Sequence, residues 1–271
     1  MNQKIISELG SDELKKFIAE KKEKDFALVD VREEFEYNES HIPGASWIRL
    51  QELEKNPSLV PDAKEVVFYC RSGARSMVAA KLFLESKSSN SAEKIYNLKP
   101  GMLGWDGAEL FEIPEIDLFK GKNTLEDLVI RGMELEKGAF KLYSSISEKY
   151  KNLPYIDSIN MLKKAETAHA KTLFKRLGRP MEEFDSYFDS LEGDIMESGI
   201  STDEALKRIE SIEKNICTGL LEFLVLMEVM AYDLYKVMAE KEKSAKKTFL
   251  TIAQEEKAHM RIIASSFILC A

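Results

Sequence analysis

The sequence has no long apolar run, few cysteines and few histidines. Its 271 residues include three cysteines, three histidines and seven prolines, and no Cys-x-x-Cys motif occurs. A membrane-spanning helix needs about 20 consecutive apolar residues, and no stretch comes near that length, so we expect no membrane partner. An odd number of cysteines without metal-binding spacing argues against a disulfide framework, a cysteine zinc site and a four-cysteine iron centre.

Basic residues are outnumbered by acidic ones. The chain has 39 Lys and Arg against 47 Asp and Glu, a net charge of -8. Such a surface repels phosphate backbones, so we expect no nucleic-acid partner. The first residues mix charges among their apolar positions and lack the apolar core of a signal peptide, which favours a cytoplasmic location. A hydrophobic content of 44% is enough for folded cores, and the length fits two ordinary domains.

The first part of the chain alternates short apolar runs with amphipathic stretches. The runs are β-rich and bounded by polar residues, which predicts buried strands. The expected strands are 26–30, 66–70, 95–98 and 45–48, and the expected helices are 12–22 and 74–84. Strands that alternate with helices predict an α/β domain over residues 1–115, with a mainly parallel sheet and helices on both faces.

After Pro114 the strand-like runs stop and helical periodicity takes over. Thr124 and Ser201 each begin a capping-box pattern, which marks the start of a helix. The expected long helices are 124–150, 154–177, 203–240 and 243–268, with a short helix near 181–191. We therefore predict an all-α four-helix bundle over residues 122–271, joined to the first domain by a linker near 113–122.

Cys70 stands at the end of a predicted strand, and a predicted helix begins four residues later. The loop between them can turn its backbone N–H groups inward, and the helix adds the positive end of its dipole. Both stabilise a thiolate, as do the positive charges of Arg71 and Arg75, so we predict a nucleophilic cysteine with a lowered pKa. The alternative is an ordinary buried strand cysteine.

Several motifs occur in the order in which rhodaneses carry them. They are Leu28-Val-Asp-Val-Arg32, Glu36, His41-Ile-Pro-Gly-Ala45, Cys70-Arg-Ser-Gly-Ala-Arg75, Gly101 and Trp105. Residues 3–112 therefore resemble a single-domain rhodanese, with an active-site loop of the length that sulfurtransferases use. This resemblance implies that Cys70 takes a sulfane sulfur from a donor, holds it as a persulfide and passes it to a thiol acceptor.

The same resemblance assigns roles to the residues around Cys70. The backbone amides of the loop would cradle the persulfide, and the loop residues are Arg71, Ser72, Gly73, Ala74 and Arg75. The two arginines would attract anionic donors such as thiosulfate or polysulfide. Asp30, Arg32 and His41 are expected to support the loop, as a charge pair and a turn-fixing histidine, rather than to react.

The helical part repeats a Glu…Glu-x-x-His pattern. Its members are Glu136, Glu166 and His169 in the first copy and Glu228, Glu256 and His259 in the second. The two glutamates are 30 residues apart in the first copy and 28 in the second. A single Glu-x-x-His is usually a surface pair, but two copies in register are hard to obtain by chance.

This spacing suits the binding of two metal ions. Residues three apart share one helix face, so a Glu and a His can bind one ion together. A lone Glu from each of two helices plus Glu-x-x-His from each of two others makes a six-ligand dinuclear site, as in ferritin-like carboxylate proteins. Oxygen-rich ligation with two histidines suits iron or manganese. The alternative is a bundle with satisfied buried polar pairs.

Through these six positions, residues 122–268 resemble the rubrerythrin branch of the ferritin-like family. The resemblance implies two iron ions, with manganese or another divalent metal as a substitute, and reduction of peroxide or dioxygen with an external electron donor. This sequence departs from the rubrerythrin pattern in two ways. Ala231 stands where rubrerythrins have a further glutamate, and no cysteine set can build a rubredoxin centre. A homodimer is expected, as in ferritin-like relatives.

The remaining candidate residues are less informative. Tyr143 and Tyr235 lie seven residues after the first glutamate of each copy, and they could simply pack, bond a ligand carboxylate or supply a protective electron path. Cys217 is expected in the core. Cys270 is expected in a frayed tail, although it could also accept sulfur from another molecule.

The combined prediction is a persulfide-forming sulfurtransferase joined to a dinuclear iron site that is used in peroxide or oxygen reduction. One alternative is a persulfide carrier whose helical part binds iron or senses redox state without rapid turnover. Another is an interaction scaffold with an inactive metal site, which metal analysis would distinguish.

Overall fold

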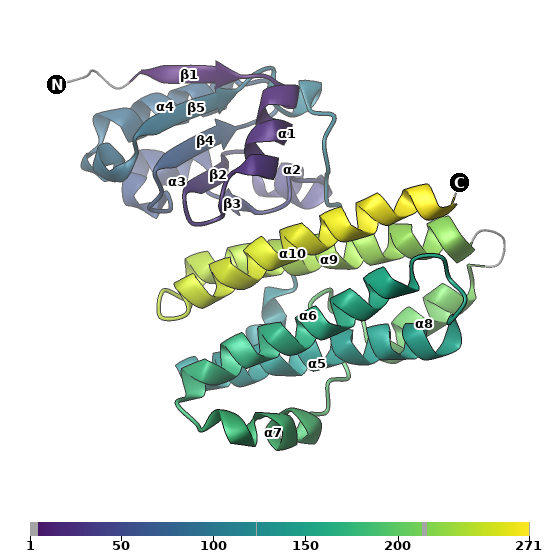
Figure 1. The fold of residues 1–271 in the computed structure, drawn as a ribbon. Coiled ribbons are helices and arrows are strands. Elements are labelled where there is room, and N and C mark those ends of the chain that lie inside the picture. The colour runs from purple at the N-terminus through teal and green to yellow at the C-terminus, as the bar shows by residue number, and fades with distance from the viewer. Residues whose placement is uncertain (1–4, 123, 213–215, 271) are drawn as a thin grey trace. The chain divides into compact units, whose positions relative to one another are not determined.

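The chain divides into two compact units. The computed structural model describes residues 5–122, 124–212 and 216–270 (Figure 1). One unit spans Met1–Ile113 and the other Pro114–Ala271. Within the described residues, no helix is both long and apolar enough to span a membrane.

The first unit contains a five-stranded sheet with the strand order β1-β5-β4-β2-β3. The strands are β1 (Ile6–Leu9), β2 (Phe26–Asp30), β3 (Ala45–Trp47), β4 (Glu65–Tyr69) and β5 (Lys94–Leu98). All pairings between neighbouring strands are parallel. The strands β2 and β4 are buried along their whole length, which explains why they read as continuous apolar runs.

Helices cover both faces of this sheet. They are α1 (Ser11–Glu20), α2 (Glu34–Glu39), α3 (Leu50–Lys55) and α4 (Ala74–Glu85). Successive side chains of a strand point to opposite faces, so Tyr69 of β4 clusters with Leu14 of α1, whereas Phe68 clusters with Phe83 of α4. The predicted α/β fold with a parallel sheet is confirmed. The elements β1, α2 and α3 are too short to show a clear apolar period, and the sequence did not predict them.

The second unit is helical. Its helices are α5 (Leu125–Lys149), α6 (Ile156–Phe174), α7 (Phe184–Ser190), α8 (Thr202–Glu210), α9 (Ile216–Lys241) and α10 (Lys246–Ser266). The helix α5 packs against α6, α9 packs against α10, and α10 also contacts α6 (Figure 1). Their facing sides form an apolar core that includes Val129, Leu234 and Phe249. Thr124 caps α5 as predicted, because its hydroxyl accepts the Asp127 amide over 3.1 Å.

Short 3-10 helices connect several of these elements. They span Pro57–Leu59, Lys87–Ser91, Gly101–Gly104, Ile116–Phe119, Lys175–Leu177, Met181–Glu183 and Phe267–Cys270.

The predicted helix over 203–240 is wrong, because α8 ends at Glu210 and α9 begins only at Ile216. The Ser211 amide bonds the carbonyls of Lys207 and Arg208, over 3.1 and 3.2 Å, which tightens the last turn of α8. No Gly or Pro marks this break in the sequence, so periodicity alone did not reveal it.

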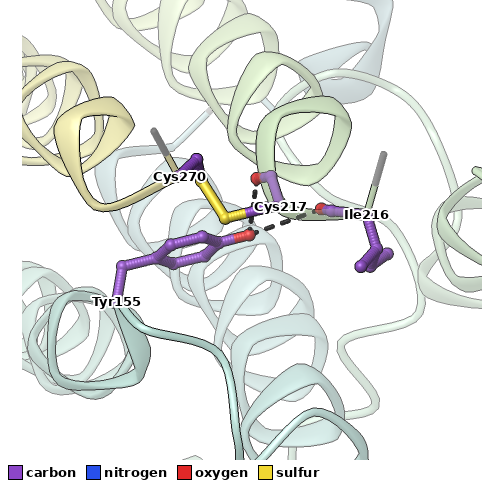
Figure 2. Close-up of a disulfide and its surroundings, with 4 residues drawn as sticks. All are labelled: Tyr155, Ile216, Cys217 and Cys270. Atoms are coloured by element: carbon purple, nitrogen blue, oxygen red, sulfur yellow. Dashed lines mark hydrogen bonds between the residues drawn. A yellow bond between two sulfur atoms is a disulfide. The ribbon is translucent and has the colours of Figure 1, made fainter. Parts of the chain in front are cut away.

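Cys217 and Cys270 form a disulfide, with their Cα atoms 5.7 Å apart (Figure 2). The expectations of a core cysteine at 217 and a frayed tail at 270 are therefore wrong. Cys217 lies in the first turn of α9, and the 3-10 helix that ends at Cys270 contacts α9. The hydroxyl of Tyr155 donates to the Cys217 carbonyl over 2.8 Å. The two cysteines meet because α10 returns along α9. The number and spacing of the cysteines in the sequence did not predict this pairing.

Candidate active site and candidate metal centre

Cys70 lies at the carboxyl end of β4, the middle strand of the sheet. The loop after it leads directly into α4, and Gly73 precedes that helix with a φ of 87°. Ligand sites of parallel sheets form outside the carboxyl ends of the strands. The structure thus places the thiol between a strand end and a helix start, as the sequence predicts.

Three donors surround the sulfur of Cys70. The Gly73 amide lies 3.2 Å from Sγ, and the amide and hydroxyl of Ser76 each lie 3.4 Å from it. Burial raises the pKa of the thiol, but the hydrogen bonds from Ser76 and from the amides of Ser72 and Gly73 outweigh burial, so the pKa of Cys70 is lowered. Among the described residues Cys70 is the free cysteine, and it is fully buried.

The segment 101–103 hydrogen-bonds to the backbone of the Cys70 loop. The amide of Met102 donates to the Cys70 carbonyl and that of Leu103 to the Arg71 carbonyl, each over 2.9 Å. Gly101 has a φ of 70°, and a Cβ at this position would lie 2.2 Å from the Cys70 carbonyl oxygen. Only glycine permits this approach, which explains why a glycine stands at 101.

Ser76 and Asn97 are site residues that the sequence reasoning missed. The hydroxyl of Ser76 donates to Asn97 Oδ1 over 2.6 Å, and Asn97 Nδ2 donates to the Gly73 carbonyl over 3.1 Å. Asn97 is only 1% exposed, and it reaches the loop from β5. A polar residue inside an apolar strand was the available signal. This buried network positions two of the donors that face Cys70.

The two arginines of the loop have different surroundings. Arg75 forms a bidentate pair with Glu36, with N–O distances of 2.7 and 2.8 Å. This pair offsets much of the charge that Arg75 would offer an anionic donor. Arg71 is exposed, as are Ser72 and Ala74. The attraction of anions that the sequence assigns to both arginines therefore depends more on Arg71.

Asp30, Arg32 and His41 brace the turn that follows β2. Arg32 donates to Asp30 Oδ2 from Nε and Nη2, over 2.9 and 2.7 Å, and from Nη2 to the Ser40 carbonyl over 2.6 Å. The His41 ring stacks on Tyr37 with centroids 4.2 Å apart. Buried bidentate pairs of this kind fix geometry, and the supporting role of these residues stays a prediction.

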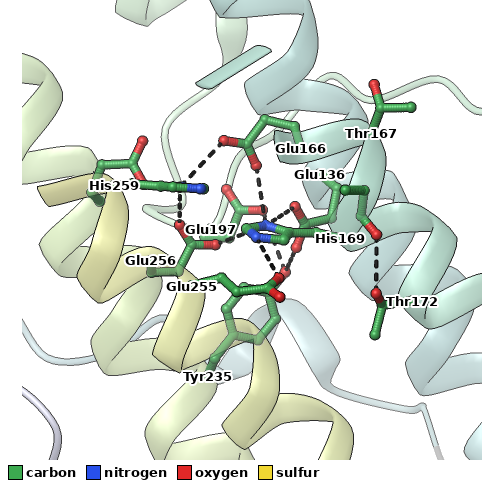
Figure 3. A network of polar contacts seen from close by, with 12 residues as sticks. Glu136, Glu166, Thr167, His169, Thr172, Glu197, Tyr235, Glu255, Glu256 and His259 are labelled. Atoms are coloured by element: carbon green, nitrogen blue, oxygen red, sulfur yellow. Dashed lines mark hydrogen bonds and ion pairs between the residues drawn. The ribbon is translucent and has the colours of Figure 1, made fainter. Parts of the chain in front are cut away.

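All the Glu and His side chains of the repeated pattern come together inside the helical unit. Glu136 lies on α5, Glu166 and His169 on α6, Glu228 on α9, and Glu256 and His259 on α10. None of these six is more than 5% exposed. Figure 3 shows five of them converging between the helices. The spacing of the sequence motif is thus matched by proximity in space.

Among the described residues their ligand atoms form three overlapping groups, within each of which the atoms lie within 4.8 Å of one another, and the smallest group is His169, Glu256 and His259. The two larger groups are Glu136, Glu166, His169 and Glu256, and Glu166, Glu228, Glu256 and His259. Glu166 and Glu256 belong to both of the larger groups, and each of these two groups has one imidazole. The donor set therefore fits a pair of divalent ions that favour carboxylate and imidazole ligands.

Ion pairs link the Glu and His side chains of this cluster. His259 Nδ1 lies 3.0 Å from Glu228 and 2.9 Å from Glu256, and His169 Nδ1 lies 3.1 Å from Glu136. Burial lowers the pKa of His259, but the two neighbouring carboxylates outweigh it and raise the pKa to about 11. Burial raises the pKa of Glu228 to about 7. The raised pKa of the imidazoles keeps positive charge beside the buried carboxylates, which would be costly to bury without such partners.

Two tyrosines link the copies of the pattern. The hydroxyl of Tyr143 donates to Glu228, and that of Tyr235 donates to Glu136. Burial raises the pKa of both phenols well above the ordinary value, so the hydroxyls stay protonated as donors. Each tyrosine thus bonds the lone glutamate of the other copy, which is one of the interpretations that the sequence left open.

Two further carboxylates near this cluster were not predicted. Glu255 lies 3.0 Å from Nε2 of His169, where a carboxylate can fix the ring's orientation. Glu197 is only 5% exposed, and the Tyr235 hydroxyl lies 3.4 Å from its Oε1. Burial, and then the charge of Glu136, raise the pKa of Glu197 well above its ordinary value. It comes from the segment between α7 and α8, where no spacing relates it to the repeated pattern.

Comparisons with known proteins match the first unit. The sequence model of the rhodanese-like domain matches residues 11–108. The protein YtwF of Bacillus subtilis (strain 168) is 35% identical over 102 residues, which are 38% of this chain and 92% of YtwF. A protein of Allochromatium vinosum named sulfurtransferase is 30% identical over 101 residues, which are 37% of this chain and 89% of that protein. YrkF of the same Bacillus strain is 38% identical over 80 residues, 30% of this chain, and the chain spans only 41% of YrkF.

Proposed function

Through residues 11–108 the chain belongs to the rhodanese-like family, and from this premise we propose that Cys70 is the sulfur-accepting nucleophile of a sulfurtransferase. The observation that supports the proposal most directly is the set of donors around Sγ, namely the Gly73 amide and the amide and hydroxyl of Ser76. They stabilise the thiolate, which is the nucleophilic form of cysteine.

The transfer has two steps. The Cys70 thiolate attacks the outer sulfur of a donor such as thiosulfate, the S–S bond of the donor breaks, and sulfite leaves with the electron pair. The loop amides then face the terminal sulfur of the Cys70 persulfide. An acceptor thiolate attacks that terminal sulfur, so the acceptor becomes the persulfide and Cys70 returns to the thiolate.

Kinetics with thiosulfate and cyanide test this proposal. The wild-type chain is expected to form thiocyanate, and Cys70→Ser is expected to lose that activity. Activity that survives in Cys70→Ser would end the assignment. A wild-type chain that forms a Cys70 persulfide yet turns over slowly would favour the carrier function over the enzyme.

We further propose that the helical unit is a ferritin-like four-helix bundle of the rubrerythrin type, whose six converging side chains hold two iron ions. The supporting observation is the pair of overlapping ligand groups with Glu166 and Glu256 in common. Bound iron would supply the electron-transfer chemistry for reducing peroxide or dioxygen. The chain's own contribution is to hold the ions in a buried site, while Tyr143 and Tyr235 orient two of the carboxylates.

Metal quantification after anaerobic loading with Fe(II) tests the second site. We expect about two ions per chain, the number that six ligands of this kind hold. Fewer than about one ion per chain would favour an interaction scaffold. Steady-state rates with peroxide and a reductant then separate a reducing enzyme from an iron-binding sensor.

A further inference from the structure

We propose that Glu197 is an additional carboxylate ligand of the metal pair, delivered by the segment between α7 and α8. This inference rests on the metal centre proposed above and adds a residue that the repeated sequence pattern does not contain.

The position of Glu197 supports this role. Its side chain is buried, and the hydroxyl of Tyr235 lies 3.4 Å from its Oε1 while also donating to Glu136. Figure 3 shows Glu197 among the side chains that surround His169 and Glu256. A buried carboxylate whose hydrogen bond from Tyr235 is this long is costly in an apolar unit. A bound cation would compensate for that cost.

A small cavity joins Glu197 to three of the six predicted ligands. Its volume is about 20 Å³, which is room for one water or ion but not for an organic substrate. The residues that line it include Tyr143, Glu166, Glu197, Glu228, Ala231 and Glu256. Ala231 lies three residues after Glu228 on α9, and its small side chain leaves this space open. Glu197 therefore faces the space that the ligands share.

The backbone fixes Glu197 in place. Met196 donates its amide to the Ile200 carbonyl over 3.1 Å, which closes a tight turn around Glu197. That turn packs closely on α5, since a Cβ on Gly138 would lie 2.5 Å from the Ile195 carbonyl oxygen. A glycine inside a helix costs about 1 kcal/mol relative to alanine. Here the glycine makes room for the segment that delivers the carboxylate.

The negative charge of Glu197 has opposite effects with and without bound metal. Four carboxylate ligands balance two divalent ions, so Glu197 adds one negative charge that holds the ions more tightly. In the metal-free chain the same charge is close to other carboxylates and opposes folding. Glu197→Gln keeps the shape of the side chain and removes only the charge. It should therefore weaken metal binding and, without metal, leave stability equal or higher.

An anaerobic titration of the full chain with Fe(II) against a colorimetric chelator tests this. Glu197→Gln is expected to bind the more weakly held ion about 10–100-fold less tightly than wild type. Thermal unfolding should show a metal-free midpoint no lower than wild type and a smaller rise on loading. The matched control is Glu192→Gln, because Glu192 belongs to the same segment but is exposed, and it should behave as wild type.

Two results would overturn the inference. Glu197→Gln that binds Fe(II) as tightly as wild type would show that the carboxylate is not a ligand. A metal-free variant that unfolds at a lower temperature than wild type would show that Glu197 serves the fold instead. A wild-type chain that binds no Fe(II) is a different failure, because it removes the metal centre itself.

Discussion

Removing the hydroxyl of Ser76 should raise the pKa of Cys70. That hydroxyl lies 3.4 Å from Sγ and 2.6 Å from Asn97 Oδ1, and it has a single proton to donate. A hydrogen bond to a charged acceptor contributes about 1.5–3 kcal/mol, and one pKa unit corresponds to about 1.4 kcal/mol. Because the contact is long and the proton is shared, we expect Ser76→Ala to raise the pKa by about one unit, at the low end of this range.

The rate of alkylation by iodoacetamide as a function of pH measures this shift. Cys70 is the free cysteine of the described chain, and Cys217 and Cys270 are bonded to each other, so without a reductant the reagent reports on Cys70. Only the thiolate reacts, so the rate rises with pH and levels off above the pKa. Since the folded-state pKa is lowered by the hydrogen bonds to Sγ, the wild-type midpoint should lie below that of the same chain unfolded in denaturant. At a fixed pH below the midpoint, Ser76→Ala should react about tenfold more slowly.

Ser72→Ala is the matched control. Ser72 belongs to the same loop, its side chain is exposed, and its amide, which supports the thiolate, is retained in the variant. Its midpoint should equal that of wild type. The reasoning is refuted if Ser76→Ala leaves the midpoint unchanged, or if Ser72→Ala shifts it as much. Equal thermal midpoints of the two variants would exclude a general loss of structure as the cause.

Three other perturbations follow from the contacts. Glu36→Gln weakens the pair that offsets the charge of Arg75, so KM for thiosulfate should fall by about two- to fivefold, and an unchanged or higher KM would contradict this account of the loop. Gly138→Ala places a methyl group against a carbonyl oxygen, which should lower the free energy of unfolding by about 1–3 kcal/mol in urea titrations; a neutral result would mean that the packed segment moves freely. Replacing Cys217 and Cys270 by alanine removes a disulfide between residues 53 apart, so the free energy of unfolding should drop by about 2–4 kcal/mol. If the wild-type chain is equally stable with and without a reductant, the disulfide does not contribute this stability.

Cys70 could be located from the sequence because its chemistry depends on local order. The sequence shows a strand, a short loop and a helix in succession, which is enough to place the thiol at a strand end. The six Glu and His positions follow in the same way from helix periodicity. In both cases the spacing along the chain fixes which side of an element each residue occupies. The structure then brings those sides together.

Contacts between distant segments could not be predicted in this way. Glu197 reaches the cluster through a turn, so no period relates it to the helices, and a glycine at 138 inside a helix does not by itself say which segment packs against it. Arg75 is bound by Glu36, 39 residues earlier, which spacing does not encode. The disulfide of Cys217 likewise depends on how α10 returns along α9. Each of these depends on tertiary packing rather than on local pattern.

The mass of the intact chain after incubation with thiosulfate tests the central claim most directly. We expect a gain of one sulfur atom per chain, located by proteolysis on the peptide that contains Cys70, lost on treatment with cyanide and absent in Cys70→Ser. A chain that gains no sulfur, or that gains it on the peptides of Cys217 or Cys270, would contradict the assignment of Cys70 as the sulfur-accepting residue.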